Sequence, residues 1–369
     1  MCLALRLRLL IPPVIAPVII SSIMSTVSPL ELTFGVELEF IIQYHPDLMT
    51  PERLAAKLDH NVDVRASIIH TLIYQALEAA DILITLQDMG DAANWSIVPD
   101  RSIEITEERL QNPEYRFMGI EIRSRILKGG TPEQLNESLD EIWQVIDTIR
   151  KQPFKILTNQ TTGLHVHVGN QHKGFPSWTL RNLCQSVYGF TSSLESIHPD
   201  HRVSSSHANS YCSSLSQALP STNCHAINLL LIEECATRDA LIDLMNPGPY
   251  KSHAYNLANL DTRKGTPSTL KQTVEFRHHA GSVDADEICA WVEVVTGLVQ
   301  WSHHVPSGVL LPILMDAERH PRFGLLEVLK IIGKEHLSTF YKGRLHIRRL
   351  LGRDPNSSVE EAGRWPEFS

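Results

Sequence analysis

The sequence has few cysteines, and none of them stands in a spacing that binds zinc. The six cysteines are spread over 369 residues without a CxxC pair and without a regular framework. Paired thiolates mark structural zinc sites, and dense disulfide frameworks mark small secreted domains. We therefore expect neither kind of site, and reduced thiols of this kind favour a cytoplasmic protein.

Two further signals are missing, an excess of positive charge and an internal repeat. The formal net charge is -9, and the basic residues are scattered along the chain instead of forming stripes. Proteins that bind nucleic acid gather their lysines and arginines on one face. We therefore expect no nucleic-acid partner, and a small-molecule substrate is the better default.

The apolar run within residues 1–24 gives no clear membrane span. Two arginines precede it, as in a secretory signal or a short anchor, but three prolines interrupt it. The uninterrupted stretch is shorter than a membrane-spanning helix needs. Three interpretations stay open: an extension of a chain that starts at Met24, a targeting segment, or an anchor. Membrane contact is expected only in the last case.

Three short segments alternate ionisable and apolar residues with a period of two. They are Gly35–Phe40, Gly163–Gly169 and Thr273–His279. Successive side chains of a strand point to opposite faces, so each segment predicts a strand with its ionisable residues on one face. The residues that share a face are Glu37 with Glu39, His165 with His167, and Glu275 with Arg277.

A surface of this kind calls for a cation. Two carboxylates about 5 Å apart repel by roughly 3 kcal/mol at an effective dielectric of about 20. Carboxylate oxygens with few imidazoles are typical ligands of a hard ion such as Mg²⁺ or Mn²⁺. The sequence therefore indicates a metal-dependent enzyme.

The rest of the chain mixes predicted helices with predicted strands. Capping signals and apolar residues at helical spacing predict helices over 51–86, 131–150, 176–197, 233–245 and 284–301, with two or three more after Pro306. Further strands are predicted over 95–105, 115–127 and 155–169, the first two as neighbours in the sheet.

Two stretches lack a clear periodic pattern or carry an unusual charge. The Ser- and His-rich stretch 191–226 has no clear period, which favours a functional lid over a disordered connection. The basic residues of 342–349 predict a solvent-exposed helix face.

The order of the motifs resembles the amidoligase family, which is related to glutamine synthetase and glutamate–cysteine ligase. The resemblance covers about residues 32–301, although Arg125 stands where the family has a proline. The motifs that carry it are Phe34–Phe40, Asp100-x-Ser102-x-Glu104, Gly119–Ser124, Thr162–Val168 and Thr273–Arg277.

This resemblance implies a fold and a division of the chain. The implied fold is α+β, a curved, mainly antiparallel sheet flanked by helices, similar to the catalytic domain of glutamine synthetase. The implied parts are an N-terminal apolar extension over 1–30, a catalytic domain over 31–305 and a C-terminal helical extension over 306–369.

The resemblance also implies an activity. It predicts an ATP-dependent ligase in which a small-molecule or peptide carboxylate attacks the γ-phosphoryl group of ATP and an amine then displaces phosphate from the acyl phosphate. ATP and Mg²⁺ or Mn²⁺ are the implied cofactors. The chain has no P-loop, and in this superfamily metals and sheet residues hold the phosphates instead.

Site roles follow from the resemblance, position by position. The implied metal ligands are Glu37, Glu39, Glu121, His165 and Glu275. The implied catalytic residues are Arg277, His167 and Arg202, and the implied nucleotide-binding residues are His165, Arg277, Glu104 and Ser124. The implied substrate-binding residues are Asn209, Tyr211 and Asn256. Asp100 is a further candidate near the metal ligands.

Two other classes of protein remain as alternatives. A metal-dependent amidohydrolase also uses a His-x-His strand, but usually on the first strand of a barrel, whereas His165 follows both Glu37 and Glu39 here. A relative that binds nucleotide or metal without catalysis is the second alternative, which the replacement at Arg125 allows.

Overall fold

The computed structural model describes residues 27–48, 64–85, 93–203, 212, 219, 223–248, 253–265 and 271–351. The predictions for the N-terminal apolar run, for Asn209 and Tyr211, and for part of the helix over 51–86 lie outside these residues. Among the helices of the described residues, none has both the length and the apolar character that a membrane crossing requires.

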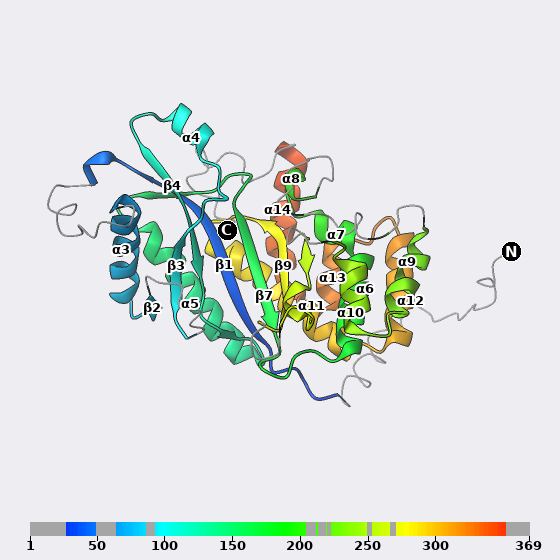
Figure 1. The fold of residues 1–369 in the computed structure, drawn as a ribbon. Coiled ribbons are helices and arrows are strands. Elements are labelled where there is room, and N and C mark those ends of the chain that lie inside the picture. The colour runs from blue at the N-terminus through cyan, green and yellow to red at the C-terminus, as the bar shows by residue number, and fades with distance from the viewer. Residues whose placement is uncertain are drawn as a thin grey trace.

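The described strands form a single nine-stranded sheet in the order β2-β3-β4-β1-β7-β9-β8, with β5 and β6 pairing with β1 (Figure 1). Every pair is antiparallel except β2 with β3. The strands are β1 Thr33–Tyr44, β2 Ile84–Thr85, β3 Trp95–Pro99, β4 Arg116–Arg123, β5 Leu127–Lys128, β6 Lys155–Leu157, β7 Gly163–Gly169, β8 Tyr255–Asn256 and β9 Thr273–Ala280. The α+β prediction is therefore confirmed.

Strand β1 lies in the middle of the sheet, and its first half alternates apolar with polar or ionisable residues. Val36 and Leu38 are each 1% exposed and face the main core, while Glu37 and Glu39 point to the other face. The neighbouring strand β7 repeats the pattern with Val166 and Val168. The period of two therefore separates an apolar face from a face that carries the ionisable residues.

Helices cover the apolar face and extend beyond β9 (Figure 1). Helix α5 begins after Thr131, whose hydroxyl accepts a hydrogen bond from the amide of Gln134, as the capping signal predicted. The longer helices are α3 Val64–Glu78, α5 Pro132–Arg150, α6 Ser177–Gly189, α9 His225–Glu233, α10 Arg238–Met245, α11 Ala285–His304, α12 Ser307–Arg319, α13 Leu325–Ile331 and α14 Ser338–Leu351. The short ones are α4 Thr106–Gln111, α7 Thr191–Glu195, α8 Asp200–Val203, and the 3-10 helices η2 Pro46–Leu48, η4 Ala258–Leu260 and η5 Glu335–Leu337.

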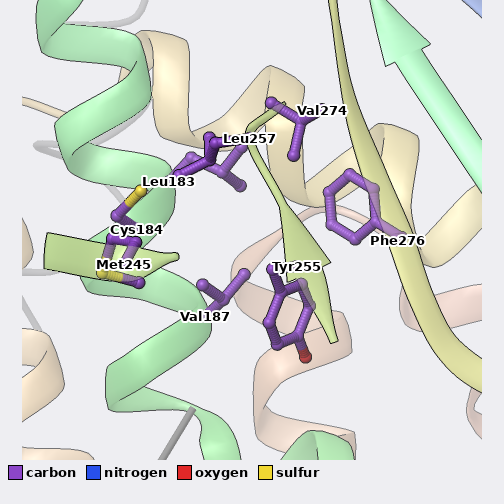
Figure 2. Close-up of a pocket in the computed structure, with 8 residues that line it drawn as sticks. All are labelled: Leu183, Cys184, Val187, Met245, Tyr255, Leu257, Val274 and Phe276. Carbon is purple, nitrogen blue, oxygen red and sulfur yellow. The ribbon is translucent and has the colours of Figure 1, made fainter. Parts of the chain in front are cut away.

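A small apolar pocket lies between α6 and the strands β8 and β9. Its volume is about 10 Å³, close to the least space that holds one water molecule. The lining side chains turn toward one another in Figure 2: Leu183, Cys184, Val187, Met245, Tyr255, Leu257, Val274 and Phe276. With apolar walls and this size, the pocket belongs to the core and does not hold a charged substrate.

The structure refines two sequence predictions about helices. The stretch 191–226, which shows no clear period, contains helix α8, and helix α9 begins inside it at His225. The single helix predicted over 176–197 is divided at Phe190, which caps α6 and precedes α7. Apolar periodicity continues across this break because Phe190 and Leu194 still point into the core.

The prediction of a solvent-exposed basic face over 342–349 was wrong at Arg344. This guanidinium is buried, and it forms an ion pair with Glu287 of α11. A buried carboxylate requires a partner, and Arg344 of α14 supplies it. The sequence pattern could not show this pairing because the two residues are far apart in the chain.

Candidate active site

The register of three strands brings the predicted metal ligands Glu37, His165 and Glu275 together with His167, which was predicted as a catalytic residue. On β1 and β7, Glu37 lies opposite His165, and Gly35 lies opposite His167. On β7 and β9, His167 lies opposite Glu275. A Cβ at Gly35 would contact Oγ of Ser124 at 3.4 Å, so this glycine allows Ser124 to pack closely against β1. The ionisable residues of β1, β7 and β9 therefore share one face of the sheet.

Arg277 follows Glu275 at the strand period of two and lies beside His165. The register between β7 and β9 shifts between Leu164 and Val166, as in a β-bulge. The Arg277 guanidinium lies 3.3 Å from Nδ1 of His165 and donates a hydrogen bond to Oε1 of Glu275. The same face of β9 therefore carries a carboxylate and a guanidinium that are in contact.

Glu37, His167 and Glu275 form the best candidate for a metal centre among the described residues. Each offers one ligand atom, and the three atoms lie within 4.8 Å of one another. Nε2 of His167 is 3.0 Å from Oε1 of Glu37 and 3.8 Å from Oε1 of Glu275. Two carboxylate oxygens and one imidazole nitrogen suit Mg²⁺ or Mn²⁺. This donor set fits the predicted ion.

Protein cations occupy part of the space around these carboxylates. Burial tends to raise the pKa of Glu37, but His167, His165 and Lys271 together hold that pKa well below its usual value. Burial also tends to raise the pKa of Glu275, but His167 and Arg277 outweigh it and lower that pKa below its usual value. Both carboxylates are therefore ionised at neutral pH, which is the form that binds a cation.

The second oxygen of Glu275 has its own partner. The side-chain amide of Asn256 donates a hydrogen bond of 2.8 Å to Oε2 of Glu275, and both groups are buried. Asn256 was predicted as a substrate contact, and the structure places its amide on Glu275, a candidate metal ligand. Its position would fix the orientation of Glu275 toward the centre of the site.

His165 sits behind this centre as a buried, neutral imidazole. Its Nδ1 is 3.5 Å from Oε2 of Glu37 and 3.5 Å from Oε1 of Glu39. Burial, helped by the charge of Arg277, lowers the pKa of His165 to about 4. A side chain at Gly163 would collide with this ring, since an added Cβ would lie 2.6 Å from Nε2. Glycine is therefore required beside His165.

A second group of carboxylates lies farther along β1. Glu39 faces Glu121 of β4 across the strand pair. Burial, with the negative charges of Asp100 and Glu121, raises the pKa of Glu39 to about 8, and burial also raises the pKa of Glu121. Glu39 accepts a hydrogen bond of 2.6 Å from the amide of Gly163, and Arg123 makes two hydrogen bonds to Glu121.

Arg202 reaches the same end of the site from α8. Its guanidinium is 1% exposed and donates a hydrogen bond to the carbonyl of Thr162, next to Gly163. A Cβ on Gly163 would also lie 2.8 Å from Arg202. Cys212 is close enough for Arg202 to influence it, but burial raises the pKa of Cys212 to about 11. That thiol is therefore a poor nucleophile at neutral pH.

Two predicted nucleotide contacts lie at the margin of this arrangement. The hydroxyl of Ser124 accepts a hydrogen bond from the amide of Val36 and donates one to the carbonyl of Arg125. Glu104 is exposed, and its amide is bonded to the hydroxyl of Thr161. In the structure, therefore, the hydroxyl of Ser124 is bonded to the backbone, and Glu104 lies exposed at the surface.

Sequence reasoning missed three residues of the site. Oγ1 of Thr273 lies 3.2 Å from Nδ1 of His167, and Nδ2 of Asn259 lies 3.4 Å from the same atom. Nζ of Lys271 lies 3.3 Å from Oε1 of Glu37. The period of two that linked Glu275 with Arg277 could have included Thr273, but no pattern marked the other two.

The comparisons with known proteins are as follows. A family model described as "Putative amidoligase enzyme" matches residues 30–299. No curated protein matches the chain.

Three glutamine synthetase-like structures are similar, each with low identity. A glutamine synthase homologue has a TM-score of 0.44 at 14% identity and covers 92% of this chain and 72% of its own. The ADP complex of GmaS has a TM-score of 0.40 at 12% identity, over 93% of this chain and 75% of its own. Plasmodium falciparum glutamine synthetase has a TM-score of 0.39 at 13% identity, over 90% and 75%.

Proposed function

The chain belongs to the amidoligase family, and on that premise we propose that it is an ATP-dependent ligase that joins a carboxylate to an amine. Family membership supports a ligase function in general terms. The observation that carries the finer proposal is the convergence of Glu37, His167, Glu275 and Arg277 on one face of the sheet. These residues supply the two groups that phosphoryl transfer needs, ligands for a divalent ion and a guanidinium for phosphate oxygens.

In the proposed reaction, an oxygen of the substrate carboxylate bonds to the γ-phosphorus of ATP, and the bond to the β,γ-bridging oxygen breaks to release ADP. The amine then attacks the carbonyl carbon of the acyl phosphate, phosphate leaves, and the amine loses a proton. A divalent ion would neutralise charge on the phosphates. Positioning and charge neutralisation supply most of the rate in reactions of this kind.

The residues of the chain divide this work. Glu37, His167 and Glu275 would hold the ion, and Asn256 would keep Glu275 oriented. Arg277 is the right shape to contact two phosphate oxygens at once, because its guanidinium presents donors in a planar fork. It would exchange its contact with Glu275 for one with the transferring phosphoryl group.

The carboxylates around Glu39 suit the amine partner. Glu39, Glu121 and Asp100 influence one another electrostatically, and burial raises the pKa of both Glu39 and Glu121. In its ionised form, such a carboxylate would attract a cationic amine and accept the proton that the amine must lose. Burial raises the pKa of Glu39 to about 8, within the range that a general base uses.

The test is ATP-dependent phosphate release in a screen of carboxylates and amines, with products detected by mass spectrometry. Wild-type protein should release phosphate only with a matched pair of substrates, whereas Glu37→Gln and Arg277→Ala should each lower the rate by at least about 1000-fold. Arg116→Ala, an exposed arginine at the far end of β4, is the matched control and should retain the wild-type rate.

Thermal unfolding of the same proteins separates a chemical role from a structural one. Both site variants should unfold within a few degrees of the wild type. A Glu37→Gln protein that turns over ATP at the wild-type rate would contradict the proposal. Nucleotide binding without phosphate release in any substrate mixture would favour a relative that binds but does not catalyse.

A further inference from the structure

The segment that leads into β9 carries a lysine on a ligand carboxylate. Nζ of Lys271 is 3.3 Å from Oε1 of Glu37, and its side chain is 60% exposed. The same oxygen of Glu37 lies 3.0 Å from Nε2 of His167. An exposed ammonium group therefore shares a carboxylate with the candidate metal centre.

The backbone next to this lysine is held in an unusual conformation. Gln272 has a φ of 53°, in the left-handed region that residues other than glycine rarely adopt, and it is 6% exposed. Such strain persists only where the surroundings enforce it, and it is concentrated at functional sites. Here it precedes Thr273, which contacts His167, so both neighbours of Gln272 reach the site.

Lys271 and a divalent ion would compete for Glu37. Like charges repel, so a bound ion at Glu37, His167 and Glu275 disfavours an ammonium group on the same carboxylate. In the contact between Lys271 and Glu37, the lysine side chain is 60% exposed and the glutamate side chain 15%, so the ammonium group can exchange the carboxylate for water. The long side chain can then move without any rearrangement of the sheet.

We propose that Lys271 is a tethered counter-ion of Glu37 that is displaced when the metal binds and then contacts the phosphates of the nucleotide. The proposal rests on the proposed function and adds a consequence for binding order. Metal alone must displace Lys271, whereas metal that enters with a polyphosphate gives Lys271 a new anionic partner. The site thereby favours joint binding of metal and nucleotide.

The experiment measures two affinities by calorimetry in the same set of proteins. The first is the affinity for Mn²⁺ alone, and the second is the affinity for a non-hydrolysable ATP analogue at saturating Mn²⁺. Lys271→Met keeps the length of the side chain and removes its charge. It should bind Mn²⁺ about tenfold more tightly and the ATP analogue about tenfold more weakly than the wild type.

Opposite shifts distinguish this role from a structural one, which would weaken both affinities together. Lys271→Arg keeps the charge and should stay within about threefold of the wild type in both measurements. Lys264→Met is the matched control: Lys264 is 59% exposed and pairs with Asp261, which is not among the candidate metal ligands. It should change neither affinity.

Two results would overturn the inference, and they can be told from a failure of the ligase proposal. Unchanged or weaker Mn²⁺ binding by Lys271→Met would show that Lys271 does not compete with the ion. Unchanged affinity for the ATP analogue would show that it does not contact the phosphates. If Glu37→Gln and the wild type bind Mn²⁺ equally, the metal centre itself is refuted, and the ligase proposal falls with it.

Discussion

Two buried clusters of ionisable groups in the described part of the chain differ in how completely their hydrogen bonds are made. In the Glu287 cluster, Arg344 forms an ion pair with Oε1 of Glu287, and the hydroxyl of Ser282 donates a hydrogen bond of 2.6 Å to Oε2. Nε2 of His279 lies farther away, 3.5 Å from Oε1. In the site cluster, which comprises Glu37, Glu39, His165, His167, Glu275 and Arg277, several contacts are long and some polar atoms are bare.

The site cluster differs in containing buried nitrogen atoms without a hydrogen-bond partner among the described residues. Nε2 of His165 and Nε of Arg277 are buried and have no hydrogen-bond partner among the described residues. Nδ1 of His165 is 3.5 Å or more from each of three carboxylates, which is longer than an ordinary hydrogen bond. A cluster that serves stability completes its bonds within the chain, whereas a cluster that binds ligands keeps capacity for them.

The largest expected effect comes from breaking the complete cluster. Arg344→Met leaves the carboxylate of Glu287 buried without its ion-pair partner, which should lower the free energy of unfolding by about 3–5 kcal/mol. Denaturant titration measures this loss. Lys330→Met, which changes an exposed lysine on α13, is the control and should shift the free energy by less than about 0.5 kcal/mol. A similar small change in Arg344→Met would remove the distinction between the clusters.

A second prediction concerns the incomplete cluster and the divalent ion that would complete it. Mn²⁺ at about 100 times its dissociation constant should stabilise the wild type by about 2.7 kcal/mol. Glu275→Gln should lose this gain, because Glu275 belongs to the candidate metal centre. Glu287→Gln should keep it, although its starting stability is lower. Thermal shifts with and without Mn²⁺ provide the measurement, and an equal gain in both variants would contradict the assignment.

The sequence predicted the site cluster better than it predicted the Glu287 cluster, and the reason is physical. A strand repeats every two residues, so the spacing along the chain is enough to pair Glu37 with Glu39 and His165 with His167. The family resemblance then implied that these strands belong to one sheet. Arg344 and Glu287 meet through helix packing between α14 and α11, for which no local pattern exists.

The same limit explains what was missed within the site. The register shift opposite His165 and the left-handed Gln272 are backbone features that depend on tertiary contacts. Neither feature has a signature in the sequence, although both lie next to residues of the site. Asn256 was identified as functional from its place before β9, but its partner Glu275 could be named only from the structure.

The third prediction tests buried histidines that lie near the Glu287 cluster. His278 packs against His198 and Tyr255, and burial, together with the charge of Arg202 and the neighbouring His279, lowers its pKa to about 3. Because the folded pKa lies below the unfolded value of about 6.5, the unfolded state takes up the proton first as the pH falls.

Stability from His278 is therefore complete above about pH 6.5 and is lost below it, by up to about 1.4 kcal/mol per pH unit. Between pH 6.5 and pH 5, the free energy of unfolding of His278→Asn should fall with decreasing pH less than that of the wild type, by up to about 1.4 kcal/mol per pH unit. Denaturant titration at several pH values gives the slopes. An unchanged slope would mean that His278 is already protonated or accessible in the folded state.

The last prediction makes one substitution in each cluster and expects opposite signs. Glu39→Gln keeps the shape of the side chain and its acceptor for the amide of Gly163, but removes a charge that burial disfavours. In the metal-free protein at pH 8 it should raise the free energy of unfolding by about 1 kcal/mol, while ligase activity is lost. Glu287→Gln removes a charge that Arg344 requires, so it should lower the free energy. Denaturant titration of both variants decides the matter. Destabilisation by both substitutions would show that the carboxylate of Glu39 supports the fold. If Glu39 serves only the chemistry, the folded protein should lose no stability when its charge is removed.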